Sequence, residues 1–273
     1  MRSRLILLAM ALAAVGLAPA TPISVDLKSA ASFGLLGGTI SNTGTSVVVG
    51  NVGATTTVTG FPPGTATGIV YPFPTDPTVM QAYQDFLNAY TLASGLSSTA
   101  SFGDLTTSFT FNGNNVYTSA QTDISSTAGI HLTFDAANDV NEVFIIKITR
   151  DLTINGPITF TLQNGAQAHN IYWIVGRTET IDPVGVPVTW DGNILAGTSF
   201  TMSSIGPSSA LGGTINGCVF ARTANTLAGT TDVNGCSSSA ASTPEPGSAA
   251  LVGFGSLLGI LRWRRQRTNR ASN

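Results

Sequence analysis

Four stretches of the chain repeat one another without a gap, and this repeat constrains the fold more than any other feature of the sequence. Each has an apolar third residue, an apolar or small fifth residue, and a final pair of threonine and a large apolar residue. They are FIIKITRDLTI (144–154), IYWIVGRTETI (171–181), GNILAGTSFTM (192–202) and GCVFARTANTL (217–227). Their starts lie 27, 21 and 25 residues apart, a period typical of a solenoid whose coils bury their apolar side only by stacking.

Each block is followed by a turn, a short alternating run and then Asn-Gly or Asp-Gly. These runs are PITFTLQNG (157–165), PVTWDG (187–192), TING (214–217) and DVNG (232–235). Glycine in such a pair supplies the positive φ that a sharp corner needs. The pattern therefore predicts coils of three short strands joined by corners, which makes the fold mainly β, a triangular β-solenoid (β-helix).

Alternation along the strands sorts the side chains into a core and an outward surface. The predicted core contains Ile154, Ile181, Met202, Leu227, Ile158, Phe160, Leu162, Val188, Trp190, Ile215 and Val233. The second strand of each coil points Thr153, Asn155, Thr180, Thr201, Ser203 and Thr226 outward, and the third strand points Thr159, Thr161, Thr189 and Thr214 outward. Charged Glu179 and Asp182 are expected to flank Thr180, with Arg150, Arg177 and Arg222 at the edge.

The first strand of each coil is apolar on both sides, so its outward residues must be covered. These residues are Ile145, Tyr172, Ile174, Leu195 and Phe220. A helical pattern over 76–95 can cover them, because Asp76 suits an N-cap, Pro77 suits the first helical position and Gly95 suits the end. One long α-helix is therefore expected alongside the solenoid.

The two ends of the chain differ from the rest. Residues 1–20 have the basic start, apolar stretch and Ala-Pro-Ala ending of a secretory signal peptide. A small-residue linker with Pro-Glu-Pro (237–246) precedes an apolar run (247–261), interpreted as a short transmembrane segment, and a basic tail (262–273). The order of Pro244-Glu245-Pro246, apolar helix and arginines resembles the PEP-CTERM sorting signal of Gram-negative bacteria. This resemblance implies processing by an exosortase-type membrane enzyme, contact with the membrane before processing, and a place on the cell surface or in the extracellular matrix.

Charge and cysteine content limit the possible partners. Without the seven arginines and the one glutamate of the two ends, five basic and thirteen acidic groups remain, a net charge near −8. This balance disfavours nucleic acid and anionic membrane surfaces as partners of the exported part. Cys218 and Cys236 each follow Asn-Gly in successive coils, and they are either a disulfide, which an exported protein permits, or two buried thiols.

Catalytic and metal motifs are missing from the sequence. His131 and His169 lack metal-ligand spacing, and no exported segment carries a Gly-x-Ser-x-Gly nucleophile elbow. Asp135, Asp139 and Glu142 lack the spacing of a calcium loop and suit a polar corner. We therefore expect no enzyme activity, no catalytic residue, no metal and no cofactor.

Several ordered segments together resemble the ice-binding protein-like domain, over residues 26 to 236. They are AASFGLLGGTISNTGTSVVVGNVG (30–53), VTGFPPGTATG (58–68), LTFDAANDVNEVFIIKI (132–148), NGAQAHNIYWIVG (164–176) and GNILAGTSFTM (192–202). The resemblance implies a discontinuous right-handed solenoid over 21–236, in which coils from both ends of the sequence interleave. It also implies adsorption to ice or ordered water through one flat face.

The leading hypothesis is thus an exported or surface-anchored antifreeze protein that inhibits ice recrystallisation. Its ice-binding surface would be centred on the outward residues of the second strand, with those of the third strand as second choice. The alternative is a cell-surface adhesion or matrix protein that holds exopolysaccharide with the same faces.

Overall fold

The computed structural model describes residues 24–72, 75–121, 123–127, 129–182, 185, 187–204 and 211–236. They belong to one compact unit that ends at Cys236. The predicted signal peptide (1–20), the linker with Pro244, Glu245 and Pro246, the apolar run (247–261) and the basic tail (262–273) lie outside the described residues. In the described part of the chain, no helix combines the length and apolarity needed to cross a bilayer.

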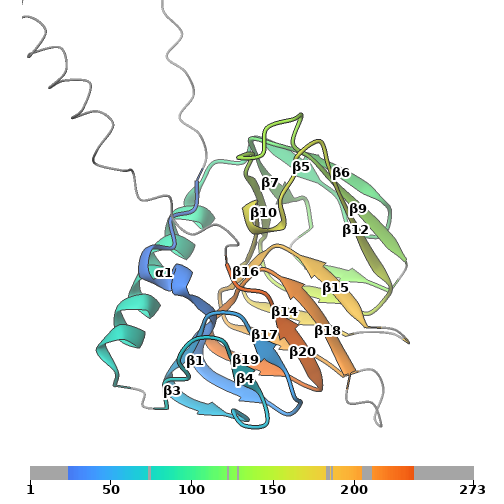
Figure 1. The fold of residues 1–273 in the computed structure, drawn as a ribbon. Coiled ribbons are helices and arrows are strands. Elements are labelled where there is room, and N and C mark those ends of the chain that lie inside the picture. The colour runs from blue at the N-terminus through green and yellow to red at the C-terminus, as the bar shows by residue number, and fades with distance from the viewer. Residues whose placement is uncertain are drawn as a thin grey trace, which may run out of the picture. The chain divides into compact units, whose positions relative to one another are not determined.

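Short parallel strands stack in three rows, as Figure 1 shows from one side. The first row contains β5 (Ala100–Phe102), β7 (Asn115–Ser119), β10 (Phe144–Ile148), β13 (Ile171–Val175) and β16 (Asn193–Ala196). The second row contains β8 (Ile124–Ser126), β11 (Leu152–Ile154), β14 (Thr178–Ile181) and β17 (Ser199–Met202). Three longer strands run through both rows, and they are β1 (Phe33–Asn42), β3 (Asn51–Thr59) and β19 (Val219–Leu227).

The third row is divided into two hydrogen-bonded sheets. One contains β6 (Phe109–Asn112), β9 (Ile130–Asp135) and β12 (Ile158–Gln163). The other contains β15 (Val188–Asp191), β18 (Leu211–Asn216), β20 (Thr230–Val233), β2 (Val47–Val48) and β4 (Thr65–Ala66). Two 3-10 turns, η1 (Lys28–Ser32) and η2 (Ala168–Asn170), complete the described elements together with the single α-helix.

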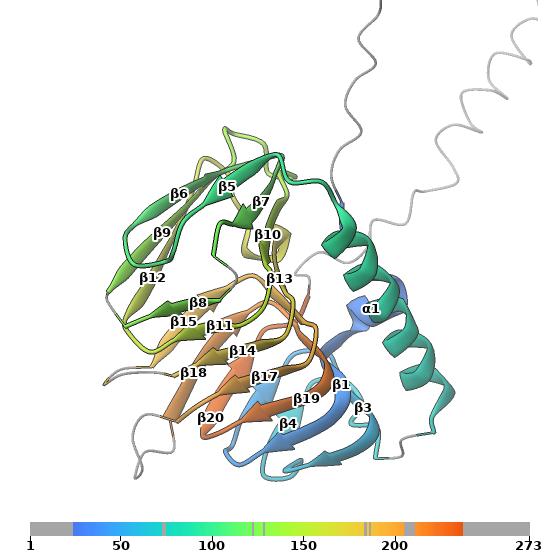
Figure 2. The ribbon, with the colours of Figure 1, turned by 180° about the vertical axis from the view of Figure 1, so that it is seen from behind.

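The order of the coils in the stack differs from their order in the sequence. Strand β1 pairs in parallel with β19 on one side and with β3 on the other, so that Leu35 lies opposite Val219. In Figure 2 the blue N-terminal strands accordingly continue the stack below the orange C-terminal ones. The discontinuous β-solenoid that the resemblance implied is therefore observed, while the right-handed winding and the triangular cross-section stay predictions.

The interior of the coils is a continuous apolar core. Every residue of the predicted core lies in it or packs against it, although Phe160 and Leu162 are only half-buried. Trp173 and Trp190 are fully buried with ring centroids 4.9 Å apart. Trp173 Nε1–H donates to the carbonyl oxygen of Asp191 at 3.0 Å, which satisfies this buried donor.

Glycine is required at the corners of the coils for two different physical reasons. Gly165, Gly192 and Gly235 have φ values of +91°, +120° and +82°, as their Asn-Gly and Asp-Gly pairs predicted. Gly217 is not among the positive-φ residues, so the prediction is wrong at that corner. A Cβ on Gly217 would lie 2.2 Å from the carbonyl oxygen of Gly192, and close stacking of successive corners therefore requires glycine there.

Helix α1 (Pro77–Gly95) lies along the first row of strands (Figure 2). Its start is capped by the Asp76 carboxylate, which accepts a hydrogen bond from the Thr78 N–H at 2.8 Å. Phe86 is fully buried in the cluster that also contains Ile145 and Phe220, with its ring 5.5 Å from that of Phe220. The predicted helix and its covering role are thus confirmed.

Candidate functional site

The outward side of the second row carries one hydroxyl group per coil, in register. Thr153 pairs with Thr180, Thr180 with Thr201, and Thr201 with Thr226. The column continues at both ends through residues that the sequence repeat did not identify. The complete column, which we call the hydroxyl face, contains Ser125, Thr153, Thr180, Thr201, Thr226, Ser41 and Thr59.

These hydroxyl groups are directed to solvent. All seven residues are half-buried or exposed. Thr59 Oγ1–H donates to the carbonyl oxygen of Ile40 at 3.1 Å. Within the described residues the other six hydroxyl groups have no hydrogen-bond partner, so their donors and acceptors are available to water.

Two further columns flank the hydroxyl face. On one side Thr178, Ser199, Ala224, Thr39 and Thr57 follow one another from coil to coil. On the other side the backbone N–H groups of Asn155, Asp182 and Ser203 donate to the carbonyls of the neighbouring coil, so these predicted residues extend the same ladder. The structure thus brings all six first-choice residues onto one side of the stack.

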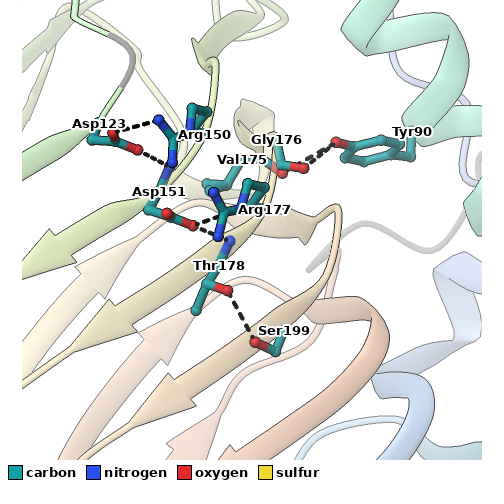
Figure 3. Close-up of polar contacts among 9 residues, drawn as sticks. All are labelled: Tyr90, Asp123, Arg150, Asp151, Val175, Gly176, Arg177, Thr178 and Ser199. Carbon is teal, nitrogen blue, oxygen red and sulfur yellow. Dashed lines mark hydrogen bonds and ion pairs between the residues drawn. The ribbon is translucent and has the colours of Figure 1, made fainter.

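Charged side chains gather at one corner of this surface. Arg150 pairs with Asp123 at 3.3 Å and Arg177 pairs with Asp151 at 3.6 Å, as Figure 3 shows. The contact in the next coils involves no charged group. There, Thr178 Oγ1 and Ser199 Oγ lie 3.2 Å apart. Over the coils of β17, β19, β1 and β3, the outward residues of all three columns carry no charge.

The expectation that Glu179 flanks Thr180 at the surface is wrong. Alternation along β14 turns Glu179 into the core between the outward Thr178 and Thr180, and its exposed fraction is 0%. Its neighbours in register are Leu152 and Phe200. Both carboxyl oxygens lack a hydrogen-bond partner, and burial raises the pKa of Glu179 well above its ordinary value. The hydroxyl face therefore carries one charge fewer than the sequence suggested.

The second-choice residues lie on an interrupted surface. Thr159 and Thr161 stand on β12, and Thr189 and Thr214 stand on β15 and β18 of the other sheet. A groove of about 350 Å³ opens between the two sheets, lined by Pro157, Ile158, Thr159, Phe160, Pro187, Val188, Thr189 and Asp191. His131 contacts Thr161 Oγ1 at 2.8 Å, and Thr214 pairs with Asp232. This face is neither continuous nor uncharged.

Cys218 and Cys236 form a disulfide, with their Cα atoms 4.4 Å apart. The bond joins the corner before β19 to the end of β20 and lies beneath the helix, beside Phe33 and Leu36. Of the two alternatives left open by the sequence, the structure contains the disulfide.

In the described ranges, no three His, Cys, Asp or Glu side chains come together as a metal site would require. His131 is exposed on β9, and His169 is half-buried in η2, where burial lowers the pKa of its imidazole.

Ser41 and Thr59 could not be found from the repeat, because their strands break its pattern. In the four blocks the outward threonine is followed by a large apolar residue, whereas Ser41 is followed by Asn42 and Thr59 by Gly60. The Asn42 side chain is buried and donates to the carbonyl oxygens of Gly44 and Gly60 at 2.7 and 2.9 Å. A polar corner replaces the apolar inward residue in these two coils.

Known proteins resemble this chain in sequence and in fold. The ice-binding-like family model matches residues 35–233. An ice-binding protein of Nostoc sp. is 33% identical over 192 residues, which cover 68% of this chain and 67% of that protein. The crystal structure of an ice-binding protein from the ascomycete Antarctomyces psychrotrophicus superposes with a TM-score of 0.65 at 31% identity, over 79% of this chain and all of that chain. An ice-binding protein from an Antarctic biological consortium gives a TM-score of 0.64 at 26% identity, over 78% and 91% of the two chains. With its coil stack and covering helix, the chain belongs to the ice-binding-like family.

Proposed function

We propose that this protein binds ice through the hydroxyl face, centred on the coils of β17, β19, β1 and β3, where the three columns carry no charged residue. The observation that carries the proposal is the unbroken column of seven serine and threonine residues in register. Relatives that are named ice-binding proteins support the same conclusion. The proposed activity is adsorption, without a catalytic step and without a cofactor.

The spacing of the columns suits an ordered layer of water. Neighbouring strands lie about 4.8 Å apart and alternate residues on a strand about 6.6 Å apart, distances of the order of the lattice repeats of ice. Threonine offers a methyl group and a hydroxyl group on a side chain that is stiff at χ1, so docking costs little rotamer entropy. Affinity would then be the sum of many weak contacts.

A bulky substitution in the centre of the hydroxyl face tests the proposal. Thr201→Tyr should reduce ice recrystallisation inhibition and thermal hysteresis, because the ring lifts the ice lattice off its neighbours Thr180 and Thr226. Thr189→Tyr, on an exposed third-row position, is the matched control and should keep full activity. Thermal melts of both variants check the fold. The proposal fails if the wild-type protein leaves ice growth unchanged, or if the two variants lose activity equally.

We also propose that the chain is exported by residues 1–20 and that the Pro-Glu-Pro tail is processed by an exosortase-type enzyme, so that the domain acts at the cell surface or in the surrounding matrix. The evidence for both steps is the sequence of the two ends. For the domain itself we propose right-handed winding and a triangular cross-section. The three strand rows support the second, and the strong preference of parallel crossovers for a right-handed path supports the first.

A second candidate function is the binding of exopolysaccharide. The groove between β12 and β15 favours it, because the half-buried ring of Phe160, the carboxyl of Asp191 and two threonines line a space of about 350 Å³, and apolar walls with a few polar groups are typical of small-molecule sites. Retention on an exopolysaccharide column, lost in Asp191→Asn and accompanied by no effect on ice growth, would select this function over ice binding.

A further inference from the structure

A second cavity lies between the C-terminal half of α1 and the first row of strands. Its volume is about 450 Å³, and it is lined by Tyr90, Ser94, Thr118, Lys147, Ile148, Thr149, Ile174 and Gly176. This space is large enough for a ligand of monosaccharide size. It lies on the helix-covered side of the stack, apart from the hydroxyl face.

Lys147 is the charged group of this cavity, and most of its hydrogen-bonding capacity is unused. The Nζ group donates to the carbonyl oxygen of Leu96, the residue after α1, at 2.6 Å. This hydrogen bond uses one of the three N–H donors of the ammonium group. No carboxylate of the described residues forms an ion pair with Lys147. Burial lowers the pKa of Lys147, as expected for a cation that lacks a counter-charge.

Two hydroxyl groups beside the cavity are buried or already engaged. Thr118 Oγ1 is buried and has no hydrogen-bond partner. Tyr90 O–H is already engaged with the carbonyls of Val175 and Gly176, as Figure 3 shows. The guanidinium carbon of Arg222 lies 5.9 Å from the centre of the Tyr90 ring. None of the residues that line the cavity is acidic, and Lys147 is the one charged residue among them.

We propose that this cavity binds a small oxyanion, such as the carboxylate of an acidic sugar, with the ammonium of Lys147 as its counter-charge. Binding would supply a partner for the unused donors of a half-buried cation. The site is separate from the hydroxyl face, so this inference does not depend on ice binding.

The chain offers a direct test, because Lys28 and Lys147 are its two lysines. In protein labelled with ¹³C at lysine Cε, the NMR spectrum contains one signal set for each. Sodium glucuronate and sodium sulfate are titrated in at constant ionic strength, with glucose as the neutral ligand of similar size. Lys28 is exposed on η1 and serves as the internal control.

We expect a saturable shift of the Lys147 signal with glucuronate, no shift with glucose, and no change at Lys28. In the bound state the pKa of Lys147 should rise. A shift with sulfate as well would assign the site to oxyanions in general, and a shift with sulfate alone would assign it to inorganic anions. Equal shifts of both lysines, or no saturable shift of Lys147 with either anion, would overturn the proposal.

Discussion

Replacing Glu179 with methionine should stabilise the protein. The carboxyl group is fully buried between Leu152 and Phe200, and neither of its oxygens has a partner. An unpaired polar group in such surroundings costs about 1–3 kcal/mol on the scale of protein mutational data. Methionine has a similar length and no such group, so the free energy of unfolding should rise by about that amount. In a domain of this size each kcal/mol corresponds to about 2–4 °C in Tm.

The gain should depend on pH. The carboxyl of the unfolded chain titrates near its ordinary pKa of 4.5, whereas burial raises the pKa of Glu179 well above this in the folded protein. Above pH 4.5 the unfolded chain therefore releases a proton that the folded protein keeps. The contribution of Glu179 to stability is fully present below pH 4.5 and falls by about 1.4 kcal/mol per pH unit as the pH rises toward the pKa of the folded form.

Urea denaturation of the wild-type protein and two variants at several pH values between 4 and 8 measures both effects. Glu179→Met should gain more over the wild type at pH 7 than at pH 4. Glu179→Gln is the matched control, because it removes the titration but keeps an unpaired polar group, and it should resemble the wild type only at low pH. If wild type and Glu179→Met show the same pH dependence, the reasoning from burial is refuted.

Two further substitutions test the supports of the coil stack. Replacing Cys218 and Cys236 together by serine opens a loop of 18 residues. The free energy of unfolding should fall by about 3 kcal/mol, measured by urea denaturation against the oxidised wild type. Equal stability would show that the disulfide contributes nothing. Asp76→Ala removes the cap of α1 and should cost about 1 kcal/mol, with Asp76→Asn retaining most of it in the same assay; an equal loss in both would contradict the capping role.

The sequence repeat predicts the coils and core of residues 144–235, and a separate helical pattern predicts the covering helix, because each depends on local alternation or on a local cap. Trp190 lies between the polar Thr189 and Asp191, and Asp76-Pro77 is a strong helix start. The pairing of β1 with β19 could not be derived locally, and the family resemblance implied only that coils from both ends of the sequence interleave. Glu179 differs from the expectation because a carboxylate is typical of the surface, whereas the outward orientation of its neighbours Thr178 and Thr180 turns Glu179 inward.

The same difference separates the predicted from the unpredicted part of the candidate site. The repeat aligns four residues of the hydroxyl face, which are Thr153, Thr180, Thr201 and Thr226. Ser41 and Thr59 join them only through contacts between distant parts of the chain. Single-chain periodicity cannot reveal such contacts, because nothing in the strand of Ser41 repeats the apolar residue that follows each of the four threonines.

The pairing of β1 with β19 can form only after the ribosome has synthesised nearly the whole domain. Thr39 and Thr223 are bonded neighbours, yet 184 residues separate them. At about 5–20 residues per second the ribosome needs roughly 10–40 s to travel that distance. Throughout this delay the earliest strand has an open edge, a hazard for misassembly. A chain that ends before β19 would lack the strand that joins β17 to β1. Truncation would therefore interrupt the hydroxyl face in its middle instead of shortening it at one end.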